Sequence, residues 1–247
     1  MSVLSIVIPA YNEEASIGKL LETILRIDTE ALGFQKELVV VNDGSKDGTE
    51  RIVRSFPAVR LVNQIPNQGR GAALKRGVRE ATGDHILFQD ADLEYSPEDY
   101  PALLRALRSG VDCVYGNRLD GVIREHGRGL LPGKHPRQSV GPWAAALVIR
   151  AWTSLLVGTW VPDMFTGYKL YPASLLKKLR LESSGFELDH EITVKLYRMG
   201  AKFGETPIRY HPRSTAEGKK IRAMDGLIAL WTVLKYRLQP WSRCIQP

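Results

Sequence analysis

The alternation of short apolar runs with helical patterns constrains the fold of this chain more than any other feature. Val3–Pro9 is a nearly continuous apolar run, and a helical stripe follows it over Ile17–Leu25. The pair of patterns recurs until five apolar runs are complete, the last being Asp112–Tyr115. Continuous apolar runs are typical of parallel strands that are covered on both faces. The pattern therefore predicts an α/β fold with a mostly parallel sheet flanked by helices.

Polar loops follow three of these runs at the point where each predicted strand ends. They are Pro9–Glu13, Asp43–Ser45 and Asp90–Glu94. In open α/β sheets, ligands bind in the crevice outside the carboxyl ends of the strands. We therefore expect the three loops to meet around one binding site.

Asp90 and Asp92 place two carboxylates close together directly after the apolar run His85–Phe88. Crowded carboxylates repel one another, and a hard divalent cation relieves the repulsion. A nucleotide diphosphate can supply the remaining oxygen ligands of such a cation. An Asp-x-Asp pattern alone is more often a solvated turn or a helix cap. Its position at a strand end favours a metal and diphosphate site.

Length and charge limit the possible functions. At 247 residues, the chain is long enough for one large α/β domain. Residues 1–117 carry 13 Lys and Arg against 17 Asp and Glu, whereas the remaining residues carry 21 against 10. This asymmetry indicates metal binding in the first part and contact with phosphate or an anionic surface in the second. Nucleic acid is the rival partner, but no helix-turn-helix, RNP-like or zinc-finger pattern is present, so we expect none.

Cysteine usage and the first residues favour the cytoplasm. Cys113 and Cys244 form neither a disulfide framework nor a zinc spacing. Met1–Ser5 lacks the basic stretch that begins a signal peptide.

The second half contains three segments that do not follow the alternation. Arg118–Pro142 is rich in Gly, Arg, His and Pro and predicts a mobile loop. Trp143–Val161 is apolar, but Arg150 lies at its centre and would cost a spanning helix about 2.5–3.5 kcal/mol, so we expect a buried or interfacial helix. Leu227–Leu234 fits either a helix in a membrane interface or an amphipathic helix packed on the domain. We predict a catalytic domain over residues 1–222 and a C-terminal amphipathic helix and tail over residues 223–247.

Several ordered motifs resemble family 2 glycosyltransferases of the GT-A fold. Ser5–Glu13, Val41–Ser45 and Asp90–Asp92 carry the resemblance to the family as a whole. Later motifs resemble its dolichol-phosphate mannosyltransferase group. These later motifs are Asp163–Tyr171, Pro207–Tyr210 and Arg213–Ile221.

The resemblance implies an inverting, metal-dependent transfer of a hexose from a nucleotide diphosphate sugar to a polyprenyl or dolichyl phosphate, with Mg²⁺ or Mn²⁺ as cofactor. GDP-mannose is the first choice of donor and UDP-glucose the second. Such an acceptor phosphate is already largely ionised at neutral pH, so it needs cations more than a general base. The enzyme would meet its lipid as a peripheral protein on the cytoplasmic face of the membrane. The alternatives are a soluble sugar or glycerate acceptor and a non-catalytic nucleotide- or nucleic-acid-binding module.

The resemblance also implies a donor site. The first loop would contact the nucleoside, the second strand end the base and ribose, and the Asp-x-Asp motif the diphosphate and metal. Glu94 stands where the group commonly has Gln, as a further metal-side ligand beside Asp90 and Asp92. The residues implied to bind the nucleotide sugar are Pro9, Tyr11, Glu13, Val41, Asp43, Asp90, Ala91, Asp92, Arg118, Arg213 and Lys219.

Catalytic and acceptor roles follow in the same way. Asp92, Asp163 and Arg118 are implied to be catalytic, with Asp163 either orienting the cations or acting as a base. Arg118, Arg137 and Lys169 are implied to bind the acceptor phosphate; Lys169 replaces a usual Arg, so bidentate binding is lost there. The residues Glu187, Asp189, His190 and Glu191 most resemble a capping or solvated arrangement, although the group motif implies that Glu191 and Asp189 help to build the acceptor side.

Overall fold

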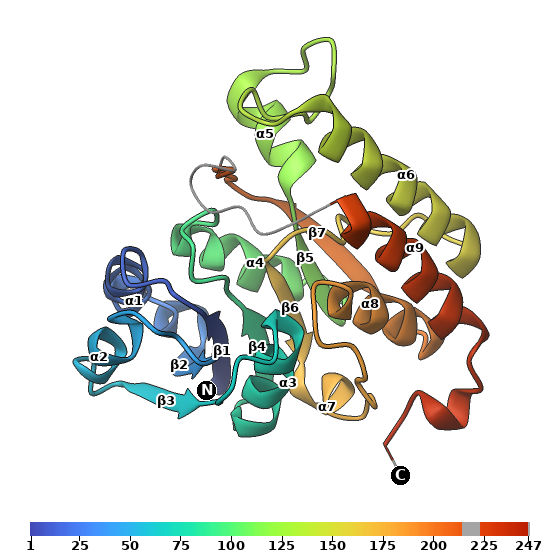
Figure 1. Cartoon of the computed structure of the whole chain (residues 1–247). Helices are drawn as coiled ribbons and strands as arrows, with labels where there is room; N and C mark the ends of the chain where they lie inside the picture. Colours follow the sequence, from blue (N-terminus) through green and yellow to red (C-terminus); the bar gives the residue numbers. More distant parts are fainter. Residues whose placement is uncertain (214–222, 247) are drawn as a thin grey trace.

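The computed structural model describes residues 1–213 and 223–246, and it has the predicted α/β architecture (Figure 1). The strands are β1 (Ser2–Ala10), β2 (Phe34–Asn42), β3 (Val59–Asn63), β4 (His85–Phe88), β5 (Cys113–Asn117), β6 (Lys169–Pro172) and β7 (Phe203–Pro207). The helices are α1 (Ile17–Arg26), α2 (Thr49–Arg54), α3 (Arg70–Glu80), α4 (Tyr100–Leu107), α5 (Arg118–His126), α6 (Val140–Val157), α7 (Ala173–Leu176), α8 (Leu188–Arg198) and α9 (Ala223–Leu238).

The described strands form one mixed sheet in the order β3-β2-β1-β4-β6-β5-β7. β1 lies between β2 and β4 and is parallel to both, and β3 continues the parallel part beyond β2. β6 is antiparallel to its neighbours β4 and β5, and β7 is again parallel to β5. The predicted mostly parallel sheet is confirmed. The antiparallel strand brings the residues that precede it to the same edge as the carboxyl ends of the others.

Alternating residues of β1 supply two hydrophobic cores, one on each face of the sheet. Leu4, Ile6 and Ile8 belong to the core that contains residues of α1 and α4. Val7 points to the opposite face, where it packs with residues of α3, α7 and α8. This two-residue period is the strand geometry that the continuous apolar run predicts for a sheet covered on both sides.

Helix α3 approaches the sheet closely at Gly77. A Cβ atom there would overlap the side chain of Val7 and lie 3.3 Å from Val41 Cγ2. Because α3 begins directly beside the predicted site, this close packing fixes the position of its first residue relative to β1 and β4.

The expected mobile loop over Arg118–Pro142 is wrong for its first part and for its last three residues, which begin α6. Arg118–His126 forms α5, which begins where the Asn117 side chain accepts a hydrogen bond from Asp120 N at 2.9 Å. Gly121 obscured this helix in the sequence, because glycine is a poor helix former. The structure explains it: a Cβ at Gly121 would overlap the Ile208 carbonyl oxygen.

Helix α6 contains the apolar segment around Arg150. Among the described residues, it is the one helix that is long and apolar enough to cross a membrane by length and composition. Arg150 Nε donates to the Val161 carbonyl at 2.8 Å and its NH2 group to Glu205 at 3.2 Å. The arginine is 7% exposed, so these bonds attach one face of α6 to the domain.

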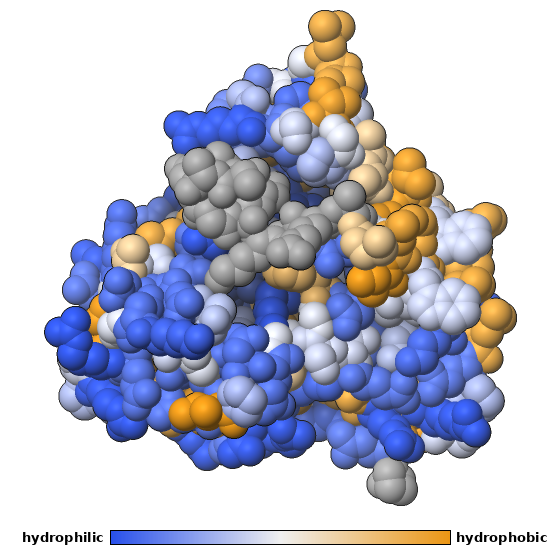
Figure 2. Space-filling model, in the orientation of Figure 1, coloured by the Kyte–Doolittle hydropathy of each residue, from blue (hydrophilic) through white to orange (hydrophobic). Residues whose placement is uncertain are grey.

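The opposite faces of α6 and α9 are apolar and exposed. The two helices pack against each other, and α9 also packs on α8. In Figure 2, a band of hydrophobic residues covers the region of α6 and α9. Exposed large hydrophobic residues of this region include Val148, Leu155, Trp160, Leu227 and Trp231. The predicted C-terminal helix thus packs on the domain by one face and exposes mainly apolar side chains on the other, so it does not show the polar outer face of an amphipathic helix packed on a domain.

Candidate active site

A cavity of about 820 Å³ lies at the edge of the sheet where the predicted loops end. Residues after β1, β2 and β4 line it together, as the strand-end argument predicts. Residues 164–167, which precede the antiparallel β6, join them from the other side. The predicted site residues that line the cavity are Pro9, Tyr11, Glu13, Asp43, Asp90, Ala91, Asp92, Glu94, Arg118 and Arg213.

Among the described residues, four that were predicted for the site do not belong to the cavity wall: Val41, Arg137, Asp163 and Lys169. The Val41 side chain is fully buried in a core cluster with Val39 and Val62, so it does not line the cavity, and the predicted role of this strand end in binding the base and ribose stays a prediction. Arg137 is exposed and lies outside the cavity wall. Asp163 lies behind Arg118. Lys219 lies outside the described residues.

Asp43 shapes the wall by holding a loop. Its carboxylate accepts hydrogen bonds from Gln64 Nε2 at 2.7 Å, from Gln68 N at 2.9 Å and from Gly69 N at 2.9 Å. Gly69 has a φ of 95°, and this loop leads directly into α3. Asp43 therefore positions the start of α3 while it lines the cavity.

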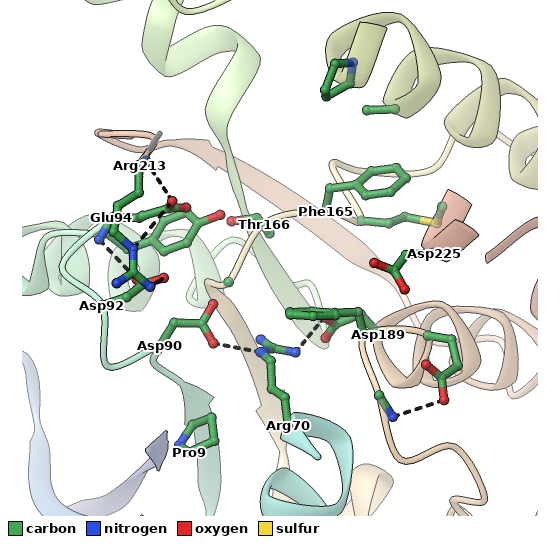
Figure 3. Close-up of a pocket in the computed structure, with 18 of the residues that line it drawn as sticks. Pro9, Arg70, Asp90, Asp92, Glu94, Phe165, Thr166, Asp189, Arg213 and Asp225 are labelled. Carbon is green, nitrogen blue, oxygen red and sulfur yellow. Dashed lines mark hydrogen bonds and ion pairs between the residues drawn. The ribbon is translucent and has the colours of Figure 1, made fainter. Parts of the chain in front are cut away.

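Arg70, the first residue of α3, connects the Asp-x-Asp motif to a carboxylate on α8 (Figure 3). Its Nε donates to Asp90 at 2.8 Å and its NH1 group to Asp189 at 2.9 Å. Lys169 Nζ pairs with the other oxygen of Asp189 at 3.1 Å. Burial raises the pKa of Asp189, but Lys169 and Arg70 outweigh burial and hold that pKa below its usual range. Two carboxylates and two cations thus neutralise one another.

This network corrects two predictions. Lys169 is fully buried and lies outside the cavity wall, so its predicted direct contact with an acceptor phosphate is wrong. The capping or solvated interpretation of the 187–191 segment is also wrong for Asp189, His190 and Glu191, which are all buried. Glu191 pairs with Lys195 at 2.5 Å and accepts backbone N–H bonds from residues 182 and 183, so it supports the segment that leads to α8.

Arg213 lies among the acidic residues on the other side of the motif (Figure 3). Its NH2 group is 2.7 Å from Asp92 and 3.5 Å from Glu13, and its backbone N–H donates to Glu94 at 2.8 Å. Burial and the neighbouring Asp90 raise the pKa of Asp92. Burial and Asp92 raise the pKa of Glu94 to about 7. The raised values mean that burial and the repulsion between these carboxylates outweigh the attraction of Arg213.

The predicted metal ligands have carboxylate oxygens, which suit a divalent cation, but their side chains are not arranged around a common point. Across residues 1–213 and 223–246, no three His, Cys, Asp or Glu side chains are arranged to hold a metal ion. Asp90 is paired with Arg70 in this structure, and Asp92 is paired with Arg213. Glu13, Asp92 and Glu94 nevertheless all lie around the Arg213 guanidinium, and their carboxylate oxygens are the ligand type that a hard divalent ion prefers.

Arg118 is the cation that faces the cavity from α5. Its Nε and NH2 groups donate to the two oxygens of Asp163 at 2.7 and 2.8 Å. Burial raises the pKa of Asp163, but Arg118 outweighs it and the pKa lies below its usual range. Because both oxygens are engaged and the acid is strong, Asp163 is suited to orienting Arg118 and poorly suited to be a base. The guanidinium also lies 5.1 Å from the ring centroid of Tyr210.

The far end of the cavity is apolar and is built by α6 and α9. Ala145, Ala146 and Ile149 come from α6, and the charged Asp225 and Gly226 come from α9. Met164 and Phe165 connect this end to the charged end, and Figure 3 shows Phe165 lying on the side away from the Asp-x-Asp motif.

Sequence reasoning missed Arg70, the role of Asp189 and the apolar end. Arg70 had a local signal, because it follows Gly69 at a helix start that comes after a strand. The pairing of Asp189 with Arg70 had no local signal, since the two residues are 119 positions apart in the chain.

Comparisons with known proteins agree with this geometry. Residues 5–179 match the profile of Glycosyl transferase family 2. The undecaprenyl-phosphate mannosyltransferase of Micrococcus luteus is 29% identical over 262 residues, which cover 96% of this chain and 99% of that protein. The dolichyl-phosphate beta-glucosyltransferase of Trichomonas vaginalis is 27% identical over 246 residues, covering 94% of this chain and 71% of that protein.

A solved structure supports the fold. The glucosyl-3-phosphoglycerate synthase of Mycobacterium tuberculosis, in complex with Mn²⁺, uridine diphosphate and phosphoglyceric acid, superposes with a TM-score of 0.68 at 21% identity. The match covers 97% of this chain and 80% of that chain. The GT-A fold that the sequence motifs imply is thereby confirmed.

Proposed function

Because the chain belongs to glycosyl transferase family 2, we propose that it transfers a hexose, with inversion at the anomeric carbon, from a nucleotide diphosphate sugar to a polyprenyl or dolichyl phosphate. The observation that carries this proposal is the cavity with two unlike ends. One end is lined by carboxylates and arginines, and the other by apolar side chains of α6 together with Met164 and Phe165, beside Asp225 and Gly226 of α9. A charged donor and an apolar acceptor chain need these two environments in one cavity.

At the charged end, the chain's own residues would bind and orient the leaving diphosphate. Asp90, Asp92 and Glu94 would hold Mg²⁺ or Mn²⁺, which supplies charge neutralisation for the departing phosphate oxygens. Arg213 and Arg70 are already positioned beside these carboxylates. When the carboxylates bind a cation, the two guanidinium groups become available to the diphosphate, where preorganised positive charge stabilises the leaving group.

Arg118 would orient the acceptor phosphate. It lines the cavity, and Asp163 fixes its orientation with two hydrogen bonds. A phosphate acceptor is largely ionised at neutral pH, so attack needs orientation by a cation rather than removal of a proton. The strongly acidic Asp163 fits this requirement.

We keep GDP-mannose as the first donor and UDP-glucose as the second. The test is transfer of radiolabelled hexose from each donor to polyprenyl phosphate in detergent, with Mn²⁺, followed by extraction of the lipid product. Asp92→Ala should lower transfer by about 10²-fold or more. Glu50→Ala removes a surface carboxylate of α2 and serves as the control. Transfer to a soluble acceptor such as 3-phosphoglycerate, with none to the lipid, would contradict the proposal.

We further propose that the exposed face of α6 and α9 rests on the cytoplasmic surface of a membrane. The apolar end of the cavity is built by these two helices, so an acceptor embedded in lipid could enter there. The Trp231 side chain is 64% exposed and Leu155 is 74% exposed. Exposed Arg237 follows on α9, and such basic residues favour anionic lipid.

Liposome flotation tests this attachment. The double variant Leu155→Ser, Trp231→Ser should float less well than the wild type with vesicles that contain anionic lipid. Ile65→Ser is the matched control, because Ile65 is 77% exposed but lies in the loop after β3. Equal loss of flotation in both variants, or no loss in either, would show that this face does not bind lipid.

A further inference from the structure

His190 is a buried side chain in the cavity wall to which neither the fold nor the proposed reaction has given a role. It belongs to the first turn of α8, directly after Asp189. Its side chain is 4% exposed and lines the cavity. Its ring packs edge-on against Phe165, with the centroids 5.0 Å apart. A rigid ring is thus held at the boundary between the charged and apolar ends.

The hydrogen-bonding state of this ring follows from its surroundings. Nδ1 is buried and has no hydrogen-bond partner among residues 1–213 and 223–246. Burial lowers the pKa of His190 to about 4, so the ring is neutral and carries one N–H. A hydrogen on Nδ1 would be a buried donor without an acceptor, which is unfavourable. The hydrogen is therefore on Nε2, and this nitrogen can donate a hydrogen bond to a ligand in the cavity.

The position of the ring indicates which part of a ligand it meets. Asp189 is connected through Arg70 to Asp90 of the Asp-x-Asp motif, so His190 lies one residue beyond the network that begins at the diphosphate end. Phe165, on its other side, leads to the apolar end. In any transfer reaction the moving group lies between the leaving group and the acceptor. The hexose therefore has to occupy the region in which His190 lies.

We propose that His190 is a specificity-determining residue whose Nε2–H donates a hydrogen bond to a hydroxyl of the transferred hexose. This inference rests on the proposed function, because it takes the cavity to hold a nucleotide sugar. A neutral donor suits an uncharged hydroxyl, whereas a phosphate oxygen would be better matched by the nearby arginines. A buried donor also discriminates between sugars, since a sugar without the correct hydroxyl leaves the donor unpaired.

Three variants separate the two ring nitrogens. His190→Phe keeps the ring that packs on Phe165 but removes both nitrogens. His190→Gln places an amide nitrogen near the position of Nε2, and His190→Asn places one near the position of Nδ1. Binding of the nucleoside diphosphate and of the nucleotide sugar is measured for each by calorimetry with Mn²⁺, using GDP with GDP-mannose and UDP with UDP-glucose. Circular dichroism melts confirm that each variant is folded.

We expect His190→Phe to weaken binding of the nucleotide sugar about three- to tenfold, the effect of one hydrogen bond, and to leave the nucleoside diphosphate within twofold. Gln should restore most of the loss, and Asn should not. Nucleotide sugars that lack single hydroxyls of the hexose identify the hydroxyl that accepts this bond. One of these deoxy analogues should bind the wild type more weakly than the parent sugar does, whereas His190→Phe should bind that analogue and the parent sugar equally tightly.

Other outcomes overturn the inference. Equal weakening of both ligands would mean that His190 supports the fold of the cavity, and no weakening would mean that it does not contact the sugar. A higher KM for the polyprenyl phosphate with unchanged donor binding would assign the hydrogen bond to the acceptor phosphate instead. Normal sugar-nucleotide binding by the wild type without transfer to lipid would refute the proposed acceptor, whereas the binding comparison would still decide the role of His190.

Discussion

Replacing Arg213 by Gln should make the ligand-free protein bind Mn²⁺ more tightly. Arg213 is 24% exposed and lies 2.7 Å from Asp92 and 3.5 Å from Glu13, so it occupies the space where a cation would meet these carboxylates. The variant leaves the carboxylates without their internal cation. A metal ion would then no longer compete with the guanidinium or be repelled by it.

The size of the effect follows from simple electrostatics. Two unit charges 4 Å apart interact by about 4 kcal/mol at an effective dielectric constant of about 20. Solvent screening and movement of the flexible guanidinium reduce this value. We expect about 1.4 kcal/mol or more to remain, which corresponds to a tenfold tighter dissociation constant.

Titration of metal-free protein with Mn²⁺, followed by electron paramagnetic resonance of the free ion, measures this change. Arg209→Gln is the matched control, because Arg209 comes from the same segment but pairs with Glu98 and Asp99 outside the cavity. With GDP or UDP present, Arg213→Gln should instead bind Mn²⁺ more weakly than the wild type, since the variant has lost a ligand for the diphosphate. Unchanged or weaker Mn²⁺ binding by Arg213→Gln in the absence of nucleotide would refute the reasoning.

Further predictions concern stability. Asp163→Leu leaves Arg118 buried without its partner and should lower the free energy of unfolding by about 3–5 kcal/mol in urea titrations; a loss below 1 kcal/mol would mean that the pair is not maintained in solution. Because burial raises the pKa of Glu94 from 4.5 to about 7, the metal-free protein should lose stability as the pH rises from 4.5 through 7. Glu94→Gln should remove this loss, and urea unfolding in EDTA at pH 5 and pH 8 compares the two proteins. Gly77→Val inserts a side chain against Val7 and should cost about 1–3 kcal/mol, visible as a lower melting temperature.

The features that sequence reasoning predicted correctly depend on local patterns. The strands before Asp43 and Asp90 were visible because buried parallel strands are continuously apolar over a few residues. Their loops met because strand ends in such a sheet share one edge. Each of these sequence patterns extends over only about ten residues.

The features that it missed depend on contacts between distant residues. Lys169 was predicted to bind the acceptor phosphate, but its pairing with Asp189 and the antiparallel pairing of β6 place it inside the protein. Helix α5 looked like a loop because it contains Gly121. This glycine is needed because the carbonyl oxygen of Ile208, which is 87 residues later in the chain, leaves no room for a Cβ atom. A single sequence does not reveal such partners, since nothing local specifies them.

The pairing of β4 with β6 has a consequence for how this protein folds while it is being synthesised on the ribosome. β4 gains its parallel neighbour β1 early, but its other edge stays open until residues Lys169–Pro172 have been made. At about 5–20 residues per second, synthesis of the roughly 80 intervening residues takes on the order of 4–16 s. During that interval the strand that ends at the Asp-x-Asp motif offers unpaired N–H and C=O groups to other chains. Nascent chains arrested before β6 should therefore aggregate, and slower translation over this stretch should increase their demand for chaperones.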